Sequence, residues 1–139
     1  MIVDRVKAAL DRDPAAHGFG ADAVWNDDVH HALRVALTGE RHEYYVDYDG
    51  VADLAFAFEH RWVFDGRWSA ARGRRHGVPA DELDHRHLIV FTQNHDHVGN
   101  TPRGERLLHD AGPADPRLRL AAAAVLLSPF TPMLFMGEE

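Results

Sequence analysis

A short, entirely apolar run, Leu88-Ile89-Val90-Phe91, constrains the fold more than any other feature of the sequence. Such a continuous run is typical of a strand that is buried on both faces, as in parallel sheets. The polar segment Gln93-Asn94-His95-Asp96-His97 follows almost at once. Because parallel sheets present functional side chains at the carboxyl ends of their strands, the sequence predicts a site at this point.

Strands and helices alternate along the rest of the chain. Apolar runs predict strands at 19–25 and 133–136, and apolar residues at helical spacing predict helices at 2–10, 29–37, 51–62 and 116–127. Asn26 or Asp27 is expected to cap the second helix and Gly39 to end it, whereas Asp115-Pro116 is typical of a helix start. Residues 64–87 are rich in Arg, His and Gly and are predicted to form a long loop.

Two of these helices have a predicted buried surface. The helix at 51–62 is expected to bury one apolar face, formed by Val51, Leu54, Ala55, Phe58 and Trp62. The helix at 116–127 is expected to be buried nearly all round. The order of elements indicates parallel βα units, and therefore an α/β fold. Three strands are too few for a closed barrel, which takes eight strands and about 250 residues. Because an apolar strand directly precedes Glu139, we expect an incomplete unit.

Composition excludes several classes of protein. Fifteen basic residues stand against 22 acidic ones, giving a net charge of −7, so nucleic acid is not an expected partner. The chain has no cysteine, which excludes disulfides and thiolate chemistry. No apolar run has the roughly 20 residues of a membrane span, and the N-terminus lacks the apolar core of a signal peptide. We therefore expect a cytoplasmic protein that does not contact membranes.

Polar side chains follow each predicted strand. Asp27-Asp28 with His30-His31 follows the first, the segment 93–97 follows the second, and Glu138-Glu139 follows the last. Each cluster also has a structural interpretation: acidic residues favour a helix N-terminus, Asp and Gly favour turns, and a terminal pair of glutamates is simply solvated. Trp25 and the tyrosines at 44, 45 and 48 are equally compatible with stacking on sugar rings or with packing in the core.

The same clusters resemble a known family. Trp25-Asn26-Asp27-Asp28-Val29-His30-His31, with Thr38-Gly39-Glu40-Arg41, resembles the malto-oligosyltrehalose trehalohydrolases of the α-amylase superfamily, glycoside hydrolase family 13. Gln93-Asn94-His95-Asp96 with Gly99-Asn100, then Gly104-Glu105-Arg106, and finally 127–139 are similar to later segments of that family. The Asn-His-Asp segment is shared across the superfamily, whereas the Asp-Asp-x-His-His segment is narrower. The resemblance covers residues 18–139, and residues 1–17, an expected helix and loop, match poorly.

The resemblance implies a partial (β/α)₈ TIM barrel, about strands six to eight with their helices, and a retaining glycosidase. The parent enzyme hydrolyses the α-1,4 bond next to the terminal trehalose of maltooligosyl trehalose and releases trehalose, without a cofactor. Asp96 matches the carboxylate that stabilises the transition state. The remaining residues match substrate-binding positions, namely Trp25, Asp27, Asp28, His30, His31, His95, His97, Gly99 and Asn100. No calcium or other metal site is implied by these residues.

Some positions depart from the family pattern. His97 stands where Gln is usual, and Thr101-Pro102 where Arg is common. The motifs of the nucleophile and the acid/base do not occur in residues 1–17, so the missing N-terminal half of the barrel is an expected partner and the chain alone is expected to be inactive.

Three other functions are compatible with parts of the sequence. A metal-dependent hydrolase would use the Asp-Asp-x-His-His segment with His95 and His97 as zinc ligands. A sugar-binding remnant would keep one wall of a cleft without catalysis, and a branching enzyme would share the superfamily's barrel. Zinc content, sugar binding without turnover and product analysis distinguish these possibilities.

Overall fold

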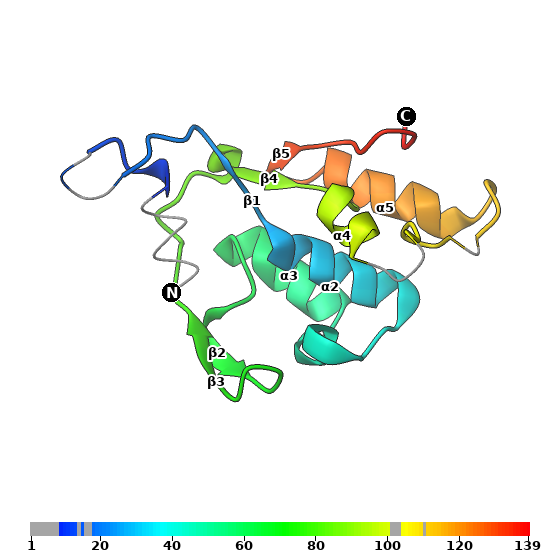
Figure 1. Cartoon of the computed structure of the whole chain (residues 1–139), viewed down its shortest axis with the longest axis horizontal. Coiled ribbons are helices and arrows are strands. Elements are labelled where there is room, and N and C mark those ends of the chain that lie inside the picture. The colour runs from blue at the N-terminus through cyan, green and yellow to red at the C-terminus, as the bar shows by residue number, and fades with distance from the viewer. Residues whose placement is uncertain (1–8, 14, 16–17, 101–103, 110) are drawn as a thin grey trace.

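The computed structural model describes residues 9–13, 15, 18–100, 104–109 and 111–139. Its main sheet has three parallel strands in the order β1–β4–β5, which are Val24–Trp25, Leu88–Val90 and Thr131–Pro132 (Figure 1). The parallel pairing that the sequence predicts is therefore present. Two backbone bonds extend the ladder past the strand ends, from Asn26 N to Ile89 O at 2.9 Å and from Met133 N to Val90 O at 2.8 Å.

The helices lie between these strands in the chain, as expected for βα units. They are α2 (Asp27–Thr38), α3 (Val51–His60), α4 (His95–Gly99) and α5 (Pro116–Leu126). Two 3₁₀ turns, η2 (Glu43–Asp47) and η3 (His85–His87), lie among them. Helix α2 ends as predicted: Gly39 has φ 74°, and its N–H donates to Val35 O. Helix α5 also begins as predicted, since the Asp115 side chain accepts from Arg117 N at 2.9 Å.

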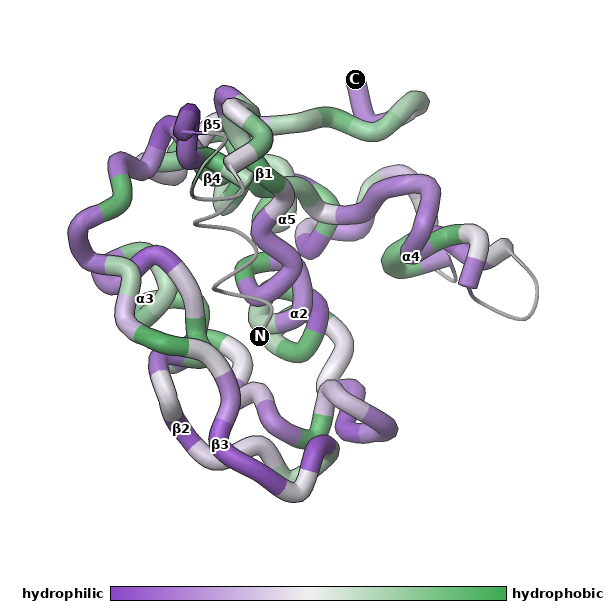
Figure 2. Tube along the Cα trace, turned by 60° about the vertical axis from the view of Figure 1, so that its left-hand side comes forward, coloured by the Kyte–Doolittle hydropathy of each residue, from purple (hydrophilic) through white to green (hydrophobic). Residues whose placement is uncertain are grey.

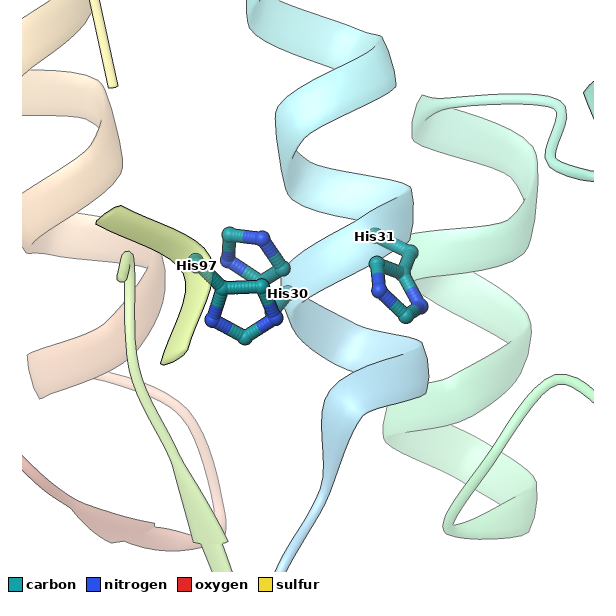
Figure 3. Close-up of side chains that lie close together, drawn as sticks. All are labelled: His30, His31 and His97. Atoms are coloured by element: carbon teal, nitrogen blue, oxygen red, sulfur yellow. The ribbon is translucent and has the colours of Figure 1, made fainter. Parts of the chain in front are cut away.

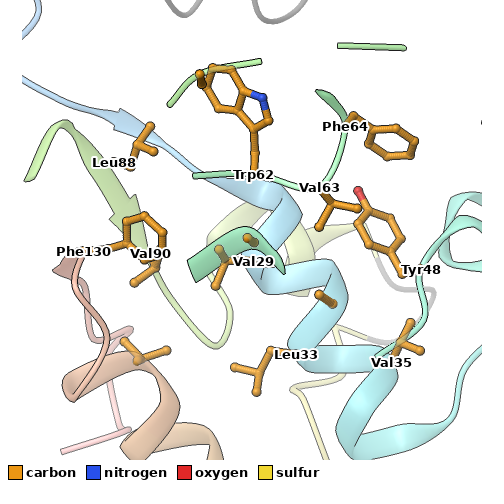
Figure 4. Close-up of a cluster of buried hydrophobic side chains, with 14 of the residues drawn as sticks. Val29, Leu33, Val35, Tyr48, Trp62, Val63, Phe64, Leu88, Val90 and Phe130 are labelled. Atoms are coloured by element: carbon orange, nitrogen blue, oxygen red, sulfur yellow. The ribbon is translucent and has the colours of Figure 1, made fainter. Parts of the chain in front are cut away.

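One hydrophobic core holds α2, α3 and the sheet together (Figure 4). Helix α2 packs against α3, α5 and β4. From α2 the core takes Val29 and Leu33, and from β4 it takes Leu88 and Val90, all at most 3% exposed. Ile89, between these two β4 residues, is half-buried, and Phe91, just after β4, is buried on the same face as Ile89. Both faces of this run are therefore at least partly covered, in agreement with its continuous apolar sequence.

The long loop predicted over 64–87 is wrong. This stretch contains an antiparallel hairpin of β2 (Asp65–Ser69) and β3 (Arg74–Gly77), and it projects from the main sheet in Figure 1. Ser69 supports the turn by accepting from Arg72 N at 3.1 Å, and its hydroxyl donates to Asp47 Oδ2 at 2.5 Å, which ties the hairpin to the preceding segment. Gly77 has φ 75°, and a Cβ there would lie 1.6 Å from Phe64 O, so only glycine fits. The hairpin is polar because it lies at the surface, which hides it from patterns of hydrophobicity.

The predicted strands at 19–25 and 133–136 are also wrong in extent. Only Val24–Trp25 pairs in the first, and the last pairs at Thr131–Pro132 instead of 133–136. Figure 2 shows the stretch after β5 as a hydrophobic run towards the C-terminus. Met136 in this run is 72% exposed, since no described element packs over it.

Two helix faces differ from the prediction. In α3, Val51 is 71% exposed and Ala55 is exposed, whereas Asp53 is buried and accepts from Arg67 Nη1 at 2.6 Å. Trp62 is buried as expected, but it lies beyond the last residue of α3. In α5 only Ala121 and Val125 are buried, so the helix is covered on one side rather than all round.

Of the helix expected at 2–10, the structure describes only Ala9 and Leu10, and both are helical. The departure at Thr101-Pro102 lies outside the described residues. Within the described ranges, no helix has the length and apolar character needed to cross a membrane.

Candidate functional site

Two of the three predicted clusters meet at the carboxyl ends of neighbouring strands. Strand β1 leads through Asn26 directly into α2, which places Asp27 and Asp28 in the first helical turn. Strand β4 leads into the one-turn helix α4, and Asn94 caps that helix by accepting from Asp96 N at 3.0 Å and His97 N at 3.1 Å. Because β1 and β4 are adjacent and parallel, the two helix starts lie next to each other.

The meeting point is a cluster of three histidines (Figure 3). The rings of His30 and His97 are stacked with centroids 3.6 Å apart and planes inclined by 30°. His31 lies beside them, 5.3 Å from His30 and 5.8 Å from His97 between ring centroids. His30 is completely buried and its Nδ1 lies 2.6 Å from the carbonyl oxygen of Thr92. The sequence predicted these three residues, and the structure brings them together.

The surroundings keep all three imidazoles neutral at physiological pH. Burial, with smaller effects of neighbouring His97, Arg72 and Arg34, lowers the pKa of His31 to about 3. Burial followed by the charge of Arg34 lowers the pKa of His97 to about 4. Burial, followed by the charge of His97, also holds the pKa of His30 well below its ordinary value. The cluster therefore presents lone pairs rather than positive charge.

Asp28 is occupied by partners within the chain. Its Oδ1 accepts from the hydroxyl of Tyr48 at 2.6 Å, and its Oδ2 accepts from Val63 N at 2.8 Å and Phe64 N at 3.0 Å. The Tyr48 hydroxyl also lies 3.1 Å from His31 Nδ1. Asp28 thus ties the start of α2 to the chain that leaves α3, and it orients His31 through Tyr48.

The outer part of the site consists of exposed polar groups. The side chains of His95 and Asp96 are 70% and 63% exposed, and His95 Nε2 lies 3.3 Å from Asp96 Oδ1. Trp25 packs edge-on against His95, with ring centroids 5.5 Å apart. Burial, followed by the charges of Asp28 and Asp96, raises the pKa of Asp27. Such an arrangement offers an aromatic ring and carboxylates to a polyhydroxylated ligand.

The remaining predicted residues of this segment end α4. Gly99 is its last residue, and the Asn100 N–H donates to Asp96 O at 2.9 Å. Both are exposed. A cavity of about 120 Å³ lies behind Trp25 and is lined by Asp27, Asp28, His31 and Tyr48 among others.

Curated proteins match this chain over most of its length. A malto-oligosyltrehalose trehalohydrolase from Arthrobacter ramosus is 50% identical over 131 residues, which are 94% of this chain. The enzyme of the same name from Saccharolobus solfataricus is 42% identical over 122 residues, and that from Deinococcus radiodurans is 44% identical over 121. This chain is homologous to a segment of the malto-oligosyltrehalose trehalohydrolases. It spans 22%, 21% and 20% of the length of these three relatives.

A solved structure agrees with this trehalohydrolase relationship. A crystal structure of a Salmonella typhimurium protein, provisionally identified as an alpha amylase, superposes with a TM-score of 0.76 at 42% identity. The match covers 84% of this chain and 20% of that protein. No protein-family model matches the sequence. The trehalohydrolase homologues are glycoside hydrolases of the α-amylase family, as the sequence predicted.

The third polar cluster, Glu138-Glu139, contacts the residues that follow β4. Glu138 accepts from Gln93 Nε2 at 2.8 Å and from the Thr92 hydroxyl, and its Oε2 accepts from Phe135 N at 2.9 Å. Gln93 in turn accepts from Leu107 N at 2.8 Å. Glu138 therefore holds the residues after β5 against the end of β4, while Glu139 is exposed and its carboxylate accepts from nearby backbone amides, including Gly137 N at 2.8 Å.

The sequence leaves open whether the tyrosines stack on sugars or pack in the core, and the structure distinguishes between these roles. Tyr45 and Tyr48 are buried, whereas Tyr44 is exposed, with its ring centroid 4.8 Å from that of His31. Arg72, Phe64 and Trp62 also line the 120 Å³ cavity, and sequence reasoning missed them there. No local pattern marks these three, because they reach the site through the hairpin and the end of α3.

Proposed function

We propose that this chain forms part of the catalytic barrel of a malto-oligosyltrehalose trehalohydrolase, comprising about strands six to eight with their helices. The single observation that carries the proposal is the convergence of Asp27, His31 and Asp96 at the carboxyl ends of adjacent parallel strands. This is the place where (β/α)₈ barrels build their active sites. The missing N-terminal half of the barrel would supply the other strands, and a cytoplasmic location belongs to the same proposal.

The proposed reaction is hydrolysis of the α-1,4 bond next to the terminal trehalose of maltooligosyl trehalose, with retention of configuration. Retaining glycosidases use a nucleophile and an acid/base whose carboxyl groups are about 5–5.5 Å apart. The family resemblance places both in segments before the matched one. Asp96 would hold sugar hydroxyls and stabilise the oxocarbenium-like transition state, and His95, 3.3 Å away, would bind the same sugar.

The burial of the site residues divides their proposed roles. Trp25, Asp27, His95, Asp96 and Asn100 are exposed and are the proposed direct contacts of the sugar. Asp28 and His30 make internal hydrogen bonds, so they would position the wall of the site instead of touching substrate. A neutral His31 would face the ligand as a hydrogen-bond acceptor, because its Nδ1 is directed at Tyr48.

The chain alone is proposed to bind sugar weakly and not to hydrolyse it, because covalent catalysis needs the nucleophile and the acid/base. A chimaera tests the function directly. The segment of the Arthrobacter ramosus enzyme that aligns with this chain is replaced by this chain, and trehalose release from maltotriosyl trehalose is measured. We expect the chimaera to release trehalose and the isolated chain to release none.

The role of Asp96 is tested in the same chimaera. Asp96→Asn is expected to lower kcat by about 100-fold or more, because a charge that stabilises the transition state is removed. Asp49→Asn is the matched control: its carboxylate is 79% exposed and pairs only with an exposed arginine, Arg41, among the contacts described. An active Asp96→Asn chimaera would exclude Asp96 from catalysis, and a chimaera that folds but releases glucose chains without trehalose would exclude the trehalohydrolase activity.

A further inference from the structure

The histidine cluster brings together three ring nitrogens that could bind one metal ion. One ring nitrogen from each of His30, His31 and His97 lies within 4.8 Å of the other two. His30 and His31 come from α2 and His97 from α4, and Figure 3 shows the rings of His30 and His97 together beside α2, with the His31 ring set apart from them. Within the described ranges this is the only such group of three.

Hydrogen bonding fixes the tautomer of His31. The Tyr48 hydroxyl donates its single proton to Asp28 Oδ1 at 2.6 Å, so towards His31 it accepts. The proton of the neutral imidazole is therefore on Nδ1, and Nε2 carries a free lone pair. This is the carboxylate-supported orientation in which histidines bind metals, with Tyr48 as the link.

His30 has the same tautomer for a different reason. Its Nδ1 lies 2.6 Å from the carbonyl oxygen of Thr92, which only accepts, so Nδ1 carries the proton. Its Nε2 is buried and has no hydrogen-bond partner in the described part of the chain. His97 Nδ1 is likewise buried without a described partner. Unpaired buried nitrogens of this kind are costly, and a ligand at this point would satisfy them.

We propose that His30, His31 and His97 bind one divalent transition-metal ion, with Zn²⁺ as the ion that suits them. Neutral imidazoles are preferred ligands of zinc, and three protein ligands leave a position for water or a carboxylate. Asp27 Oδ1 lies 4.0 Å from His97 Nε2, the ring nitrogen opposite Nδ1, so that carboxylate would orient the His97 ring while Nδ1 binds the ion.

The distances between the three histidine rings show which side chain must move when a metal binds. Imidazoles bound to one tetrahedral zinc at about 2.0–2.1 Å have ring centroids roughly 5 Å apart. The His30–His31 distance of 5.3 Å and the His31–His97 distance of 5.8 Å are close to this, whereas the His30–His97 distance of 3.6 Å is too short. Binding therefore requires His97 to leave the stack. His97 lies in the five-residue helix α4 and also contacts Phe91, with ring centroids 5.6 Å apart, so this movement would change that contact as well.

Charges around the cluster act in both directions. Burial, followed by the negative charges of Asp28 and Asp96, raises the pKa of Asp27, so a cation near Asp27 would be stabilised by these charges. Arg34 and Arg72 face the histidines and oppose it. The imidazole ligands are neutral, so the nearby carboxylates would balance the charge of a bound divalent ion. We therefore expect the carboxylates to outweigh the two arginines in their effect on metal binding.

The test measures binding of Zn²⁺ to the whole chain by equilibrium dialysis with mass-spectrometric metal analysis. We expect one ion per chain, with visible absorption bands of low-symmetry cobalt when Co²⁺ is used instead. His31→Gln and His97→Gln are each expected to weaken binding by about tenfold or more, and Tyr48→Phe by about tenfold, because it removes the group that orients His31.

His95→Gln is the matched control, since it lies two residues from His97 but outside the cluster, with its side chain 70% exposed. It is expected to bind Zn²⁺ as the unchanged chain does. Circular dichroism of each variant establishes that it is folded. An absence of bound zinc, or equal weakening in His95→Gln and His97→Gln, would overturn the proposal.

Discussion

The hydroxyl of Tyr48 donates to Oδ1 of Asp28 at 2.6 Å, and both groups are buried or nearly so. This bond joins η2 and its following loop to the start of α2, 20 residues away in the chain. It also leaves the hydroxyl oxygen to accept from His31. The first turn of α2, which carries Asp27 and the histidines, is thus held by contacts from distant parts of the sequence.

Tyr48→Phe is expected to destabilise the fold. The change leaves Asp28 Oδ1 and His31 Nδ1 without their partner in a buried setting, which costs about 1–3 kcal/mol. Urea unfolding followed by circular dichroism measures this free energy. Tyr44→Phe is the comparison: its hydroxyl also bonds a tyrosine, Tyr45, but the residue is 36% exposed, so water can replace that bond and the expected cost is below about 1 kcal/mol. Equal costs for the two variants would show that the Tyr48 bond does not contribute.

Asp28→Asn is expected to reverse the tautomer of His31. The amide oxygen can accept from Val63 N and Phe64 N as Oδ2 does, which leaves the NH₂ group facing Tyr48. The Tyr48 hydroxyl would then accept from the amide and donate to His31 Nδ1, moving the imidazole proton to Nε2. Long-range ¹H–¹⁵N NMR of the histidine rings distinguishes the two tautomers. An unchanged tautomer would mean that Tyr48 does not set it.

These relationships mark the limit of what the sequence predicts. The caps at Gly39, Asp115 and Pro116 are local signals, and α2 and α5 end or begin where they indicate. The strand at Leu88–Val90 is recognisable because it is at least partly covered on both faces and therefore has an unbroken apolar sequence. The polar segments after β1 and β4 could be placed together because parallel strands share a carboxyl edge.

Elements without such signals were mispredicted. The β2–β3 hairpin is polar, and its pairing depends on Gly77 and on Ser69 binding Asp47, 22 residues away. Asp53 occupies a buried position in α3 because Arg67 compensates its charge, a partner that the helical spacing does not reveal. In the site, the internal bonds of Asp28 are equally hidden, since all of its partners are at least 20 residues distant.

Mild acid is expected to destabilise the protein through the histidine cluster. The folded-state pKa values of His31, about 3, and His97, about 4, lie below the ordinary value of 6.5, and that of His30 is lowered as well. The unfolded chain therefore binds more protons than the folded one below pH 6.5. The contribution of the neutral histidines to the unfolding free energy is complete above pH 6.5 and is lost as the pH falls towards 4 and 3. Each such group lowers the unfolding free energy by up to about 1.4 kcal/mol per pH unit.

The pH effect is measured by urea unfolding between pH 7 and pH 5, before most carboxylates titrate. His97→Gln is expected to reduce the slope, because one of the three groups is removed. His95→Gln, with its exposed ring, is expected to keep it. A slope that is unaffected by His97→Gln would exclude His97 as a source of the acid sensitivity.

Gly77→Ala is expected to disrupt the hairpin. The residue has φ 75°, and its new Cβ would overlap Phe64 O at 1.6 Å, which requires the backbone of a core segment to move. The expected cost is at least about 3 kcal/mol by thermal or urea unfolding. Gly73→Ala is the control: its φ of 60° is also positive, but its Cβ meets nothing within 4 Å. That change is expected to cost only about 1–2 kcal/mol from the left-handed conformation.

Glu138→Ala is expected to release the residues after β5 from the end of β4. The carboxylate accepts from Thr92, Gln93 and Phe135, so its loss frees both sides of this junction. Hydrogen exchange should become faster at the Phe135 amide and at the Leu107 amide, which Gln93 holds. Glu139→Ala removes bonds to the backbone amides of residues 137–139 but none to the Phe135 or Leu107 amide, and should leave both rates unchanged. Unchanged exchange in Glu138→Ala would mean that strand pairing alone positions the residues after β5. It would also mean that Gln93 keeps the loop before Asp96 in place without the Glu138 carboxylate.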